Sequence, residues 1–317
     1  MPVLRRLPLV ESGSDSLIVE GSDNGILCLS EFRTSIVYLW NPTTRELKKL
    51  PSPNCPNTQF RFGFGYDSLT NDFKVIMISS PIEIIVDPSK LISLFNSSIA
   101  QVLAYSLRGN SWKRIKMSDW FPHVRHPCAC TNFDCSVVVN GSVHWPLGYY
   151  DHPDISRKYK FGIIAFNLNT EIFKLMESPQ QHITRDSEQS IGKLSEYLSS
   201  MTRRTPGLIE IWVMKEYGIS DSWIKQVKVD LTKCSINSPP DIKLSPFQSF
   251  SLQWSSFLHP YKDFYPIAFG NNGYVLICSD SYGLFWYNPY SNNLEFLCPK
   301  MYVIGFTNYV ESDYLLN

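Results

Sequence analysis

The stretch IIAFNLNTEIFKLME, from Ile163 to Glu177, decides how the whole chain is interpreted. A short run of β-branched and aromatic residues ends in a polar corner, and the chain then restarts on a second aromatic residue. Phe166, the last aromatic of the first run, stands seven residues before Phe173. Short runs that are apolar on both alternating faces are typical of strands covered on both sides. The stretch therefore predicts a β-hairpin whose two faces are both buried.

Four other passages repeat this pattern. Three of them keep the spacing of seven, between Trp40 and Leu47, between Tyr105 and Trp112, and between Tyr287 and Leu294. The fourth lies in IEIWVMKEYGISDSWIKQVK and places Trp212 and Trp223 four residues further apart. Repetition at this scale indicates one supersecondary unit that the chain uses many times.

A second type of hairpin precedes the first. Asn-Gly stands between two strand-like runs in Ser16–Ser30, Cys135–Gly148 and Tyr265–Ser279, and this pair accepts the positive φ that a tight type I′ turn requires. Phe62–Ile78 contains the longer turn Asp67–Asp72. The two hairpins together form a four-stranded antiparallel unit, whose strands we letter a to d in chain order.

Five such units, or six, predict an all-β fold, a Kelch-like β-propeller of four-stranded blades. A β-sandwich is the alternative. The fourth unit has the weakest pattern, because Ile191–Met201 lacks a turn signal and could equally be a short helix. We expect a leader at residues 1–15 and the propeller at residues 16–317. Tyr302–Asn317 should add a strand that pairs with the first blade and closes the ring.

Charge and targeting signals narrow the class of partner. Lys plus Arg equals Asp plus Glu at 29 each, so no net field attracts nucleic acid or an anionic membrane. The first residues lack an apolar run long enough for a signal peptide, and no segment has the length of a membrane helix. Eight cysteines without a secretory signal indicate reduced thiols. We therefore expect a cytoplasmic or nuclear protein.

Connection lengths divide the predicted ring into two faces. The a–b and c–d turns emerge on one face and are all short. The b–c and d–a connections emerge on the other, and five of them are long, a feature that favours function. These five are Pro81–Ala100, Met117–Asp134, Tyr149–Lys160, Ser178–Ser190 and Thr232–Lys262. This asymmetry predicts a recognition surface for a protein on the face with the long connections.

Four aromatic residues in these connections do not follow the repeat. Trp120, Phe121, Tyr149 and Tyr150 are the candidate partner-binding residues, because aromatic side chains dominate the energetics of interfaces. The alternative is that they pack the loops to which they belong.

Enzymatic signatures are weak. His123, His126, Cys128, Cys130 and Cys135 have enough ligands for zinc but not the usual spacing. We expect no catalytic residues, cofactor or metal. A propeller enzyme or small-molecule binder remains the alternative function, and it should place charged residues on the innermost strands. The candidate innermost segments, Leu17–Glu20, Phe62–Gly65, Ser136–Val139 and Ile267–Gly270, hold one carboxylate, Glu20.

Several of these passages, in this order, resemble the plant F-box-associated domain of F-box/Kelch-repeat proteins, including the S-locus F-box group. The resemblance covers Ser16–Asn317, and Ile209–Trp223 is its most specific part. It implies a propeller that captures a protein substrate for a cullin–RING (SCF) ubiquitin ligase, with S-RNase recognition as one option. The family carries an F-box ahead of this domain, whereas only Met1–Asp15 precede it here. We therefore expect a Skp-family adaptor and cullin as partners only if the full-length protein has an F-box. The alternative is a truncated or ligase-uncoupled binding module.

Overall fold

The computed structural model describes residues 17–31, 35–53, 58–81, 101–115, 126–128, 136–150, 159–179, 188–205, 208–237, 264–269, 274–279, 283–298 and 311–316. These residues form five antiparallel sheets of four consecutive strands, which we call blades A to E. Two of the sheets gain one additional short strand.

Blades A and B occupy the first part of the chain. Blade A is β1 (Leu17–Asp23), β2 (Ile26–Glu31), β3 (Val37–Trp40) and β4 (Leu47–Lys49). Blade B is β5 (Thr58–Asp67), β6 (Asp72–Pro81), β7 (Gln101–Ser106) and β8 (Ser111–Ile115).

Blades C and D follow. Blade C is β10 (Val137–Val139), β11 (Ser142–Tyr150), β12 (Tyr159–Asn167) and β13 (Phe173–Glu177), and β9 (His126–Cys128) also pairs with β11. Blade D is β14 (Glu188–Leu194), β15 (Tyr197–Thr205), β16 (Leu208–Met214) and β17 (Trp223–Asp230), with the short 3₁₀ helix η2 (Ser220–Ser222) before β17.

Blade E is β19 (Phe264–Phe269), β20 (Val275–Ser279), β21 (Gly283–Asn288) and β22 (Asn293–Cys298). Between blades D and E the chain forms η3 (Leu231–Lys233) and then β18 (Ser235–Asn237), which pairs in parallel with β22. This outer strand was not predicted from the sequence, which read the whole of Thr232–Lys262 as a connection.

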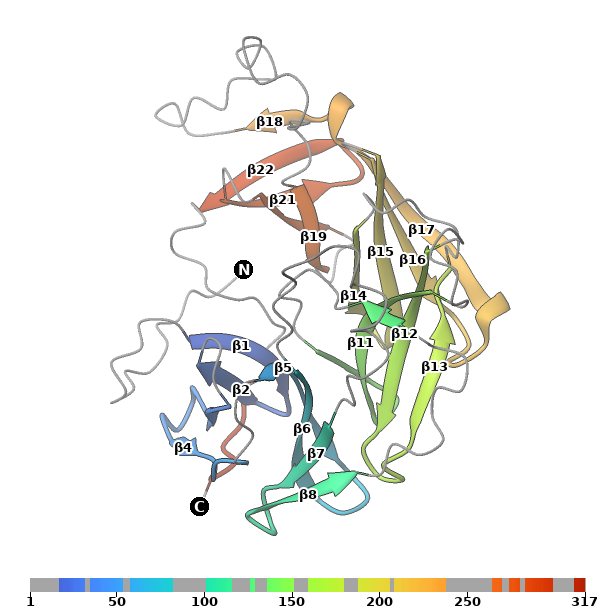
Figure 1. Cartoon of the computed structure of the whole chain (residues 1–317). Helices are drawn as coiled ribbons and strands as arrows, with labels where there is room; N and C mark the ends of the chain where they lie inside the picture. The colour runs from blue at the N-terminus through green and yellow to red at the C-terminus, as the bar shows by residue number, and fades with distance from the viewer. Residues whose placement is uncertain are drawn as a thin grey trace.

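The blades follow one another around a common centre, with strand a of each blade innermost (Figure 1). The fold is therefore the predicted all-β propeller, with five blades, and the β-sandwich alternative is wrong. Apolar clusters fill the spaces between neighbouring blades: one joins A to B, one B to C, one C to D and one D to E.

The spacing of seven has a simple structural cause. The two aromatic or apolar residues are direct cross-strand neighbours on strands c and d, as in Phe166 opposite Phe173. The same pairing joins Trp40 to Leu47, Tyr105 to Trp112 and Tyr287 to Leu294. Their side chains pack at short distance on a buried face, which stabilises antiparallel pairs.

Each of these four corners is built in the same way. In each corner, the residue five positions after the strand c aromatic has a positive φ. These residues are Arg45, Asn110, Glu171 and Asn292. In three corners an asparagine, Asn41, Asn167 or Asn288, accepts hydrogen bonds at Oδ1 from the backbone two and three residues further on. An asparagine side chain that bonds its own turn in this way favours the turn over a continued strand.

The c–d pairing of blade D differs from that of the other four blades. Trp223 lies opposite Met214, and Trp212 lies opposite Lys225, because the longer corner and a bulge between Ile211 and Trp212 shift the pairing. Trp212 and Trp223, which the sequence places eleven residues apart, are therefore not cross-strand neighbours. The lysine ammonium lies 5.0 Å from the centre of the Trp212 ring.

The a–b turns follow the sequence prediction where the structure describes them. Asn24 and Gly25 both have positive φ, as do Asn140 and Gly141. The uncertain fourth unit is also a hairpin, in which Ser195 adopts a positive φ between β14 and β15, so the helical alternative is wrong. The Asn-Gly of the fifth unit lies outside the described residues.

The two glycines of the sequence FGFG at Phe62–Gly65 allow blades B and C to approach closely. A Cβ atom on Gly63 would lie 2.1 Å from the Trp145 ring, and one on Gly65 would lie 2.7 Å from Leu168. The Trp145 indole also donates a 2.8 Å hydrogen bond to the carbonyl of Phe62. These glycines therefore serve packing between the blades.

The expected closing strand is only partly supported. Residues 311–316 return to blade A, as Figure 1 shows, but they form no strand, and residues 302–310 lie outside the described part of the chain. Side-chain hydrogen bonds from Asn41 attach this segment to blade A.

Phe166 and Tyr105 provide a test of the blade assignment, because both side chains are fully buried. Phe166→Ala or Tyr105→Ala should lower the free energy of unfolding by roughly 3–5 kcal/mol, through lost burial and the cavity left behind. Chemical denaturation measures this change. Tyr290→Ala is the control, since Tyr290 is 83% exposed at a corner of the same type. An equal effect at the exposed and buried positions would contradict the packing described here.

Candidate recognition surface

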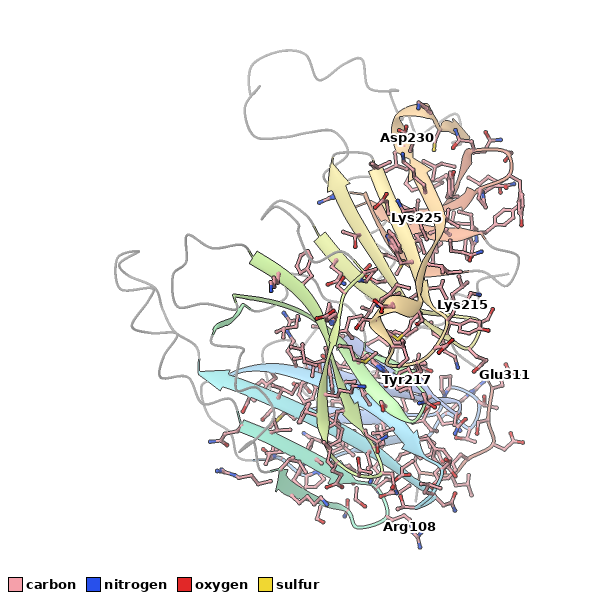
Figure 2. The ribbon with its side chains drawn as sticks, turned by 90° about the vertical axis from the view of Figure 1, so that its right-hand side faces the viewer. Arg108, Lys215, Tyr217, Lys225, Asp230 and Glu311 are labelled. Carbon is pink, nitrogen blue, oxygen red and sulfur yellow. The ribbon has the colours of Figure 1, made fainter. Side chains whose placement is uncertain are left out.

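Opposite ends of the blades carry different connections. We call the end with the a–b and c–d turns the short-turn face and the end with the b–c and d–a connections the long-connection face. Figure 2 shows Arg108, Lys215 and Tyr217, all from short turns, on one side of the molecule. The described strand ends confirm that every b–c and d–a connection of blades A to E starts on the other side.

The strands extend further into the long connections than the sequence indicated. Pro81 belongs to β6, Tyr149 and Tyr150 belong to β11, and β14 already begins at Glu188. The Met117–Asp134 connection is interrupted by β9 and Thr232–Lys262 by β18. The remaining parts of these five connections lie almost entirely outside the described residues.

The four candidate aromatic residues do not share one structural setting. Trp120 and Phe121 lie outside the described residues. Tyr149 and Tyr150 are strand residues, which corrects their assignment to a loop. Tyr149 lies opposite Pro127 and Lys160, and Tyr150 lies opposite His126 and Tyr159.

The pairing of β9 with β11 brings part of the His/Cys-rich segment beside the two tyrosines. β9 takes the inner edge of β11 near the long-connection face, whereas β10 takes that edge near the short-turn face. Only His126 and Cys128 of the five cluster residues belong to described strands. No group of three or more metal-ligating side chains occurs among the residues the structure describes.

The innermost strands carry more charge than predicted, because they are longer than the segments read from the sequence. Besides Glu20 they include Asp23, Arg61, Glu188 and Lys193. Burial raises the pKa of Glu20 to about 7, although a 2.5 Å hydrogen bond from Ser30 and the charge of Arg61 oppose that shift. Charges near the axis are therefore present, which the sequence reasoning missed.

Hydrogen bonds between blades use several polar groups near this axis. The Ser136 amide and hydroxyl both donate to the carbonyl of Glu20, at 2.8 and 2.9 Å. Asp23 accepts a 2.8 Å hydrogen bond from the Tyr66 amide, and burial raises the pKa of Asp23 despite this bond. Ser136 thus links blade C to blade A, and Asp23 links blade A to blade B. These hydrogen bonds hold the inner strands of the three blades together.

Buried ionic contacts join blades B and C at the short-turn face. The Lys74 ammonium lies 3.0 Å from Asp67 and 3.5 Å from Glu171, and it donates to the carbonyl of Leu168 at 2.5 Å. Burial alone would raise the pKa of Asp67, but hydrogen bonds and the Lys74 charge hold it below its usual value. Lys113 makes a further 2.6 Å ion pair with Glu171.

A buried histidine joins blades C and D. His144 is fully buried, with Nδ1 3.1 Å from the Val137 carbonyl and Nε2 2.9 Å from the Tyr217 hydroxyl. Tyr217 comes from the c–d corner of blade D. Burial lowers the pKa of His144 to about 4, despite hydrogen bonds with the backbone of Val137 and Ser142. The neutral imidazole therefore acts as an interblade contact.

The short-turn face, which the sequence analysis characterised only by its short turns, carries exposed apolar side chains. Seven large apolar residues are exposed in the described part of the chain, and each lies in or beside a short turn or against blade A's c–d corner. They are Leu69, Ile172, Tyr197, Ile219, Ile224, Tyr290 and Leu315. The signal that could have identified them is the apolar residue within otherwise polar corners.

Comparisons with known proteins agree with this architecture. A family model described as an F-box associated beta propeller domain matches residues 12–242. F-box protein CPR1 of Arabidopsis thaliana is 30% identical over 230 residues, 68% of this chain and 52% of that protein. From the same plant, F-box/kelch-repeat protein At3g23880 is 23% identical and F-box/WD-40 repeat-containing protein 1 is 26% identical. They align with 68% and 81% of this chain, and with 54% and 55% of their own lengths.

The chain thus spans about half the length of these relatives. Across the described residues, no helix combines the length and the apolar character needed to cross a membrane.

His144 makes stability depend on pH in a defined direction. Its pKa is about 4 in the folded protein and 6.5 in the unfolded chain, so the unfolded chain binds the extra proton first as pH falls. The contribution of the imidazole to the free energy of unfolding should be fully present above pH 6.5. It should decline by about 3 kcal/mol as the pH approaches 4. The measurement is urea unfolding of the wild type and of His144→Gln between pH 4 and 7.

The difference in unfolding free energy between the two proteins isolates this effect. Glu20, whose folded pKa is raised, contributes the opposite trend and does so in both proteins. A difference that stays constant across this pH range would show that His144 is not buried in its neutral form.

Proposed function

This chain belongs to the family of F-box associated beta propeller domains, and from that membership we propose that it is a non-enzymatic domain that recognises a protein substrate. By analogy with F-box proteins, its partners besides the substrate would be the other components of an SCF ubiquitin ligase. S-RNase recognition is one option for the substrate. The domain would act in the cytoplasm or the nucleus.

The observation that carries this proposal is the asymmetry between the two ends of the blades. Four-stranded blades with tight turns at one end form a rigid frame, and the five long connections all leave from the other end. Function concentrates on long connections that a rigid scaffold positions. The ring thus presents its least regular sequence on one side, as a surface for macromolecular recognition requires.

The described inner strands favour binding over catalysis. Glu20, Asp23 and Ser136 are engaged in hydrogen bonds within and between blades, and Lys193 forms a 3.0 Å ion pair with Glu196. Catalytic carboxylates act when they can reach a substrate proton within hydrogen-bond distance. Glu20, Asp23 and Ser136 instead form hydrogen bonds within and between blades.

Coupling to the ligase would need an F-box. We expect the chain of 317 residues to show no stoichiometric association with a Skp-family adaptor and cullin in a reconstitution from purified components. The same chain with an F-box fused ahead of Met1 should associate with both. Stoichiometric binding by the unfused chain would reveal an adaptor-binding element within these residues and would contradict this expectation.

The proposed recognition surface can be tested against the opposite face. A partner identified by affinity purification and mass spectrometry should lose at least about thirty-fold in affinity with Trp120→Ala combined with Tyr150→Ala, because aromatic anchors each contribute about 2 kcal/mol or more. The melting temperature should change little. Isothermal titration with the purified partner measures the affinity.

The control variants lie on the short-turn face. Leu69→Ser combined with Ile172→Ser removes two exposed apolar side chains there, and Arg45→Glu or Arg108→Glu reverses an exposed charge. These changes should leave partner affinity within about two-fold, since surface substitutions away from an interface have small effects. Loss of binding in this set, with full binding in the aromatic pair, would place recognition on the short-turn face.

A further inference from the structure

Residues 311–316 lie against blades A and B at the short-turn face, and we call the surface that they contact the segment site. Burial alternates along the segment: Ser312, Tyr314 and Leu316 are at least partly buried, whereas the residues between them are exposed. This alternation is that of an extended peptide with every second side chain directed at its receptor. Figure 2 shows Glu311 at the edge of the molecule beside blade A.

Two side chains anchor the segment. Leu316 is 4% exposed within the apolar cluster that blades A and B share. The Tyr314 ring packs edge-on against Phe73, with ring centres 4.9 Å apart. Tyr314 also lies near Asp72 and Arg108, whose charges act on its hydroxyl, and burial raises the pKa of that hydroxyl.

Two side chains of blade A form hydrogen bonds with the backbone of the segment. The Asn41 side-chain amide donates to the carbonyls of Ser312 and Tyr314, at 2.9 and 2.8 Å. The Glu46 carboxylate accepts a 2.9 Å hydrogen bond from the Leu316 amide. A donor and an acceptor from one corner thus meet alternate groups of an extended backbone, as in other receptors for extended peptides.

Asn41 binds residues 311–316 and its own corner through different atoms. Its Oδ1 accepts from the amides of Thr43 and Thr44, as the equivalent asparagines Asn167 and Asn288 do in their own corners. Its Nδ2 is directed to the segment instead. The corner asparagine of blade A therefore binds residues 311–316 in addition to stabilising its own turn. The side-chain amides of Asn167 and Asn288 have different partners.

From these contacts we propose that the segment site, formed by Asn41, Glu46, Phe73 and Arg108, is a peptide-binding site. It accepts an extended segment with an aromatic residue followed two positions later by leucine, and in this structure the chain's own residues 311–316 occupy it. The partner in trans is a peptide of that chemistry, and the chain's own segment competes with it. This site is separate from the long-connection face of the proposed function.

The segment suits such an exchange because of how it is attached. In the described residues, it makes no strand pairing with blade A, and the side chains of Asn41 and Glu46 form hydrogen bonds to its backbone. Attachment in cis gives it a high effective concentration, so an external peptide binds well only when the chain's own anchors are removed or released.

Peptide binding tests the proposal directly. A fluorescent peptide with the sequence ESDYLLN should bind saturably to the full chain carrying Tyr314→Ser and Leu316→Ser, measured by anisotropy. It should bind the wild-type chain at least about tenfold more weakly, because the intact segment competes. A peptide with serine at both anchor positions, ESDSLSN, should not bind either protein.

A matched pair of asparagine variants identifies the site. Asn41→Asp, added to the anchor-free chain, retains Oδ1 for its corner but replaces the donor to two carbonyls with an acceptor. It should weaken the peptide by roughly thirty-fold, the loss expected for two hydrogen bonds. Asn167→Asp makes the same change in blade C, where no peptide binds, and should leave affinity unchanged.

A second variant covers the case in which the anchor-free chain does not fold. A protease site placed within residues 299–310 of the wild-type chain can be cut after folding, and the labelled peptide should then exchange with the released segment. Equal peptide affinity for the wild-type and anchor-free chains, equal effects of the two asparagine changes, or absence of exchange after cleavage would overturn the proposal.

Discussion

Every other feature of the structure depends on the fact that the blades are apolar on both faces. In β3 all four residues are buried, and in β2 all six are buried, so neither face can be left to solvent. Burial of apolar area contributes about 25 cal/mol per Å² and is the dominant favourable term in folding. A single blade on its own could bury neither face, because a sheet face is buried only against another element. The blades must therefore stack around an axis, and shared apolar clusters stabilise the interfaces A–B, B–C, C–D and D–E.

Polar groups act mainly where this stacking brings blades together. Lys74 with Asp67 and Glu171 joins B to C, and His144 with Tyr217 joins C to D. Removing one member of such a buried set leaves the others without compensation, which costs more than the contact itself contributes. Asp23 and Ser136, near the axis, belong to the same class, because their hydrogen bonds join blade A to blade B and blade C to blade A.

Much of the fold could be predicted because it is local in sequence. The spacing of seven reports a cross-strand pair, and Asn-Gly reports a positive-φ turn, so four of the five blades were recognisable from single passages. Blade D was harder, because Ser195 makes its a–b turn without an Asn-Gly signal and a bulge shifts its c–d register. The candidate site depended on chain segments that meet only in three dimensions. The pairing of β9 with Tyr149 and Tyr150, the parallel strand β18 and the second function of Asn41 leave no mark in local sequence.

The attachment of residues 311–316 to blade A has a consequence for the order of folding. Asn41 and the carbonyl it contacts in Tyr314 are 273 positions apart, so blades A and B leave the ribosome long before the segment that packs against them. Contacts of such large separation form late, since the whole intervening chain must first become compact. During synthesis Phe73 and its neighbours lack that cover, and the early blades present apolar surface of the kind that chaperones bind. Because these contacts form late, substitutions at Asn41 or Leu316 should mainly speed the unfolding of the finished molecule and leave its rate of folding nearly unchanged.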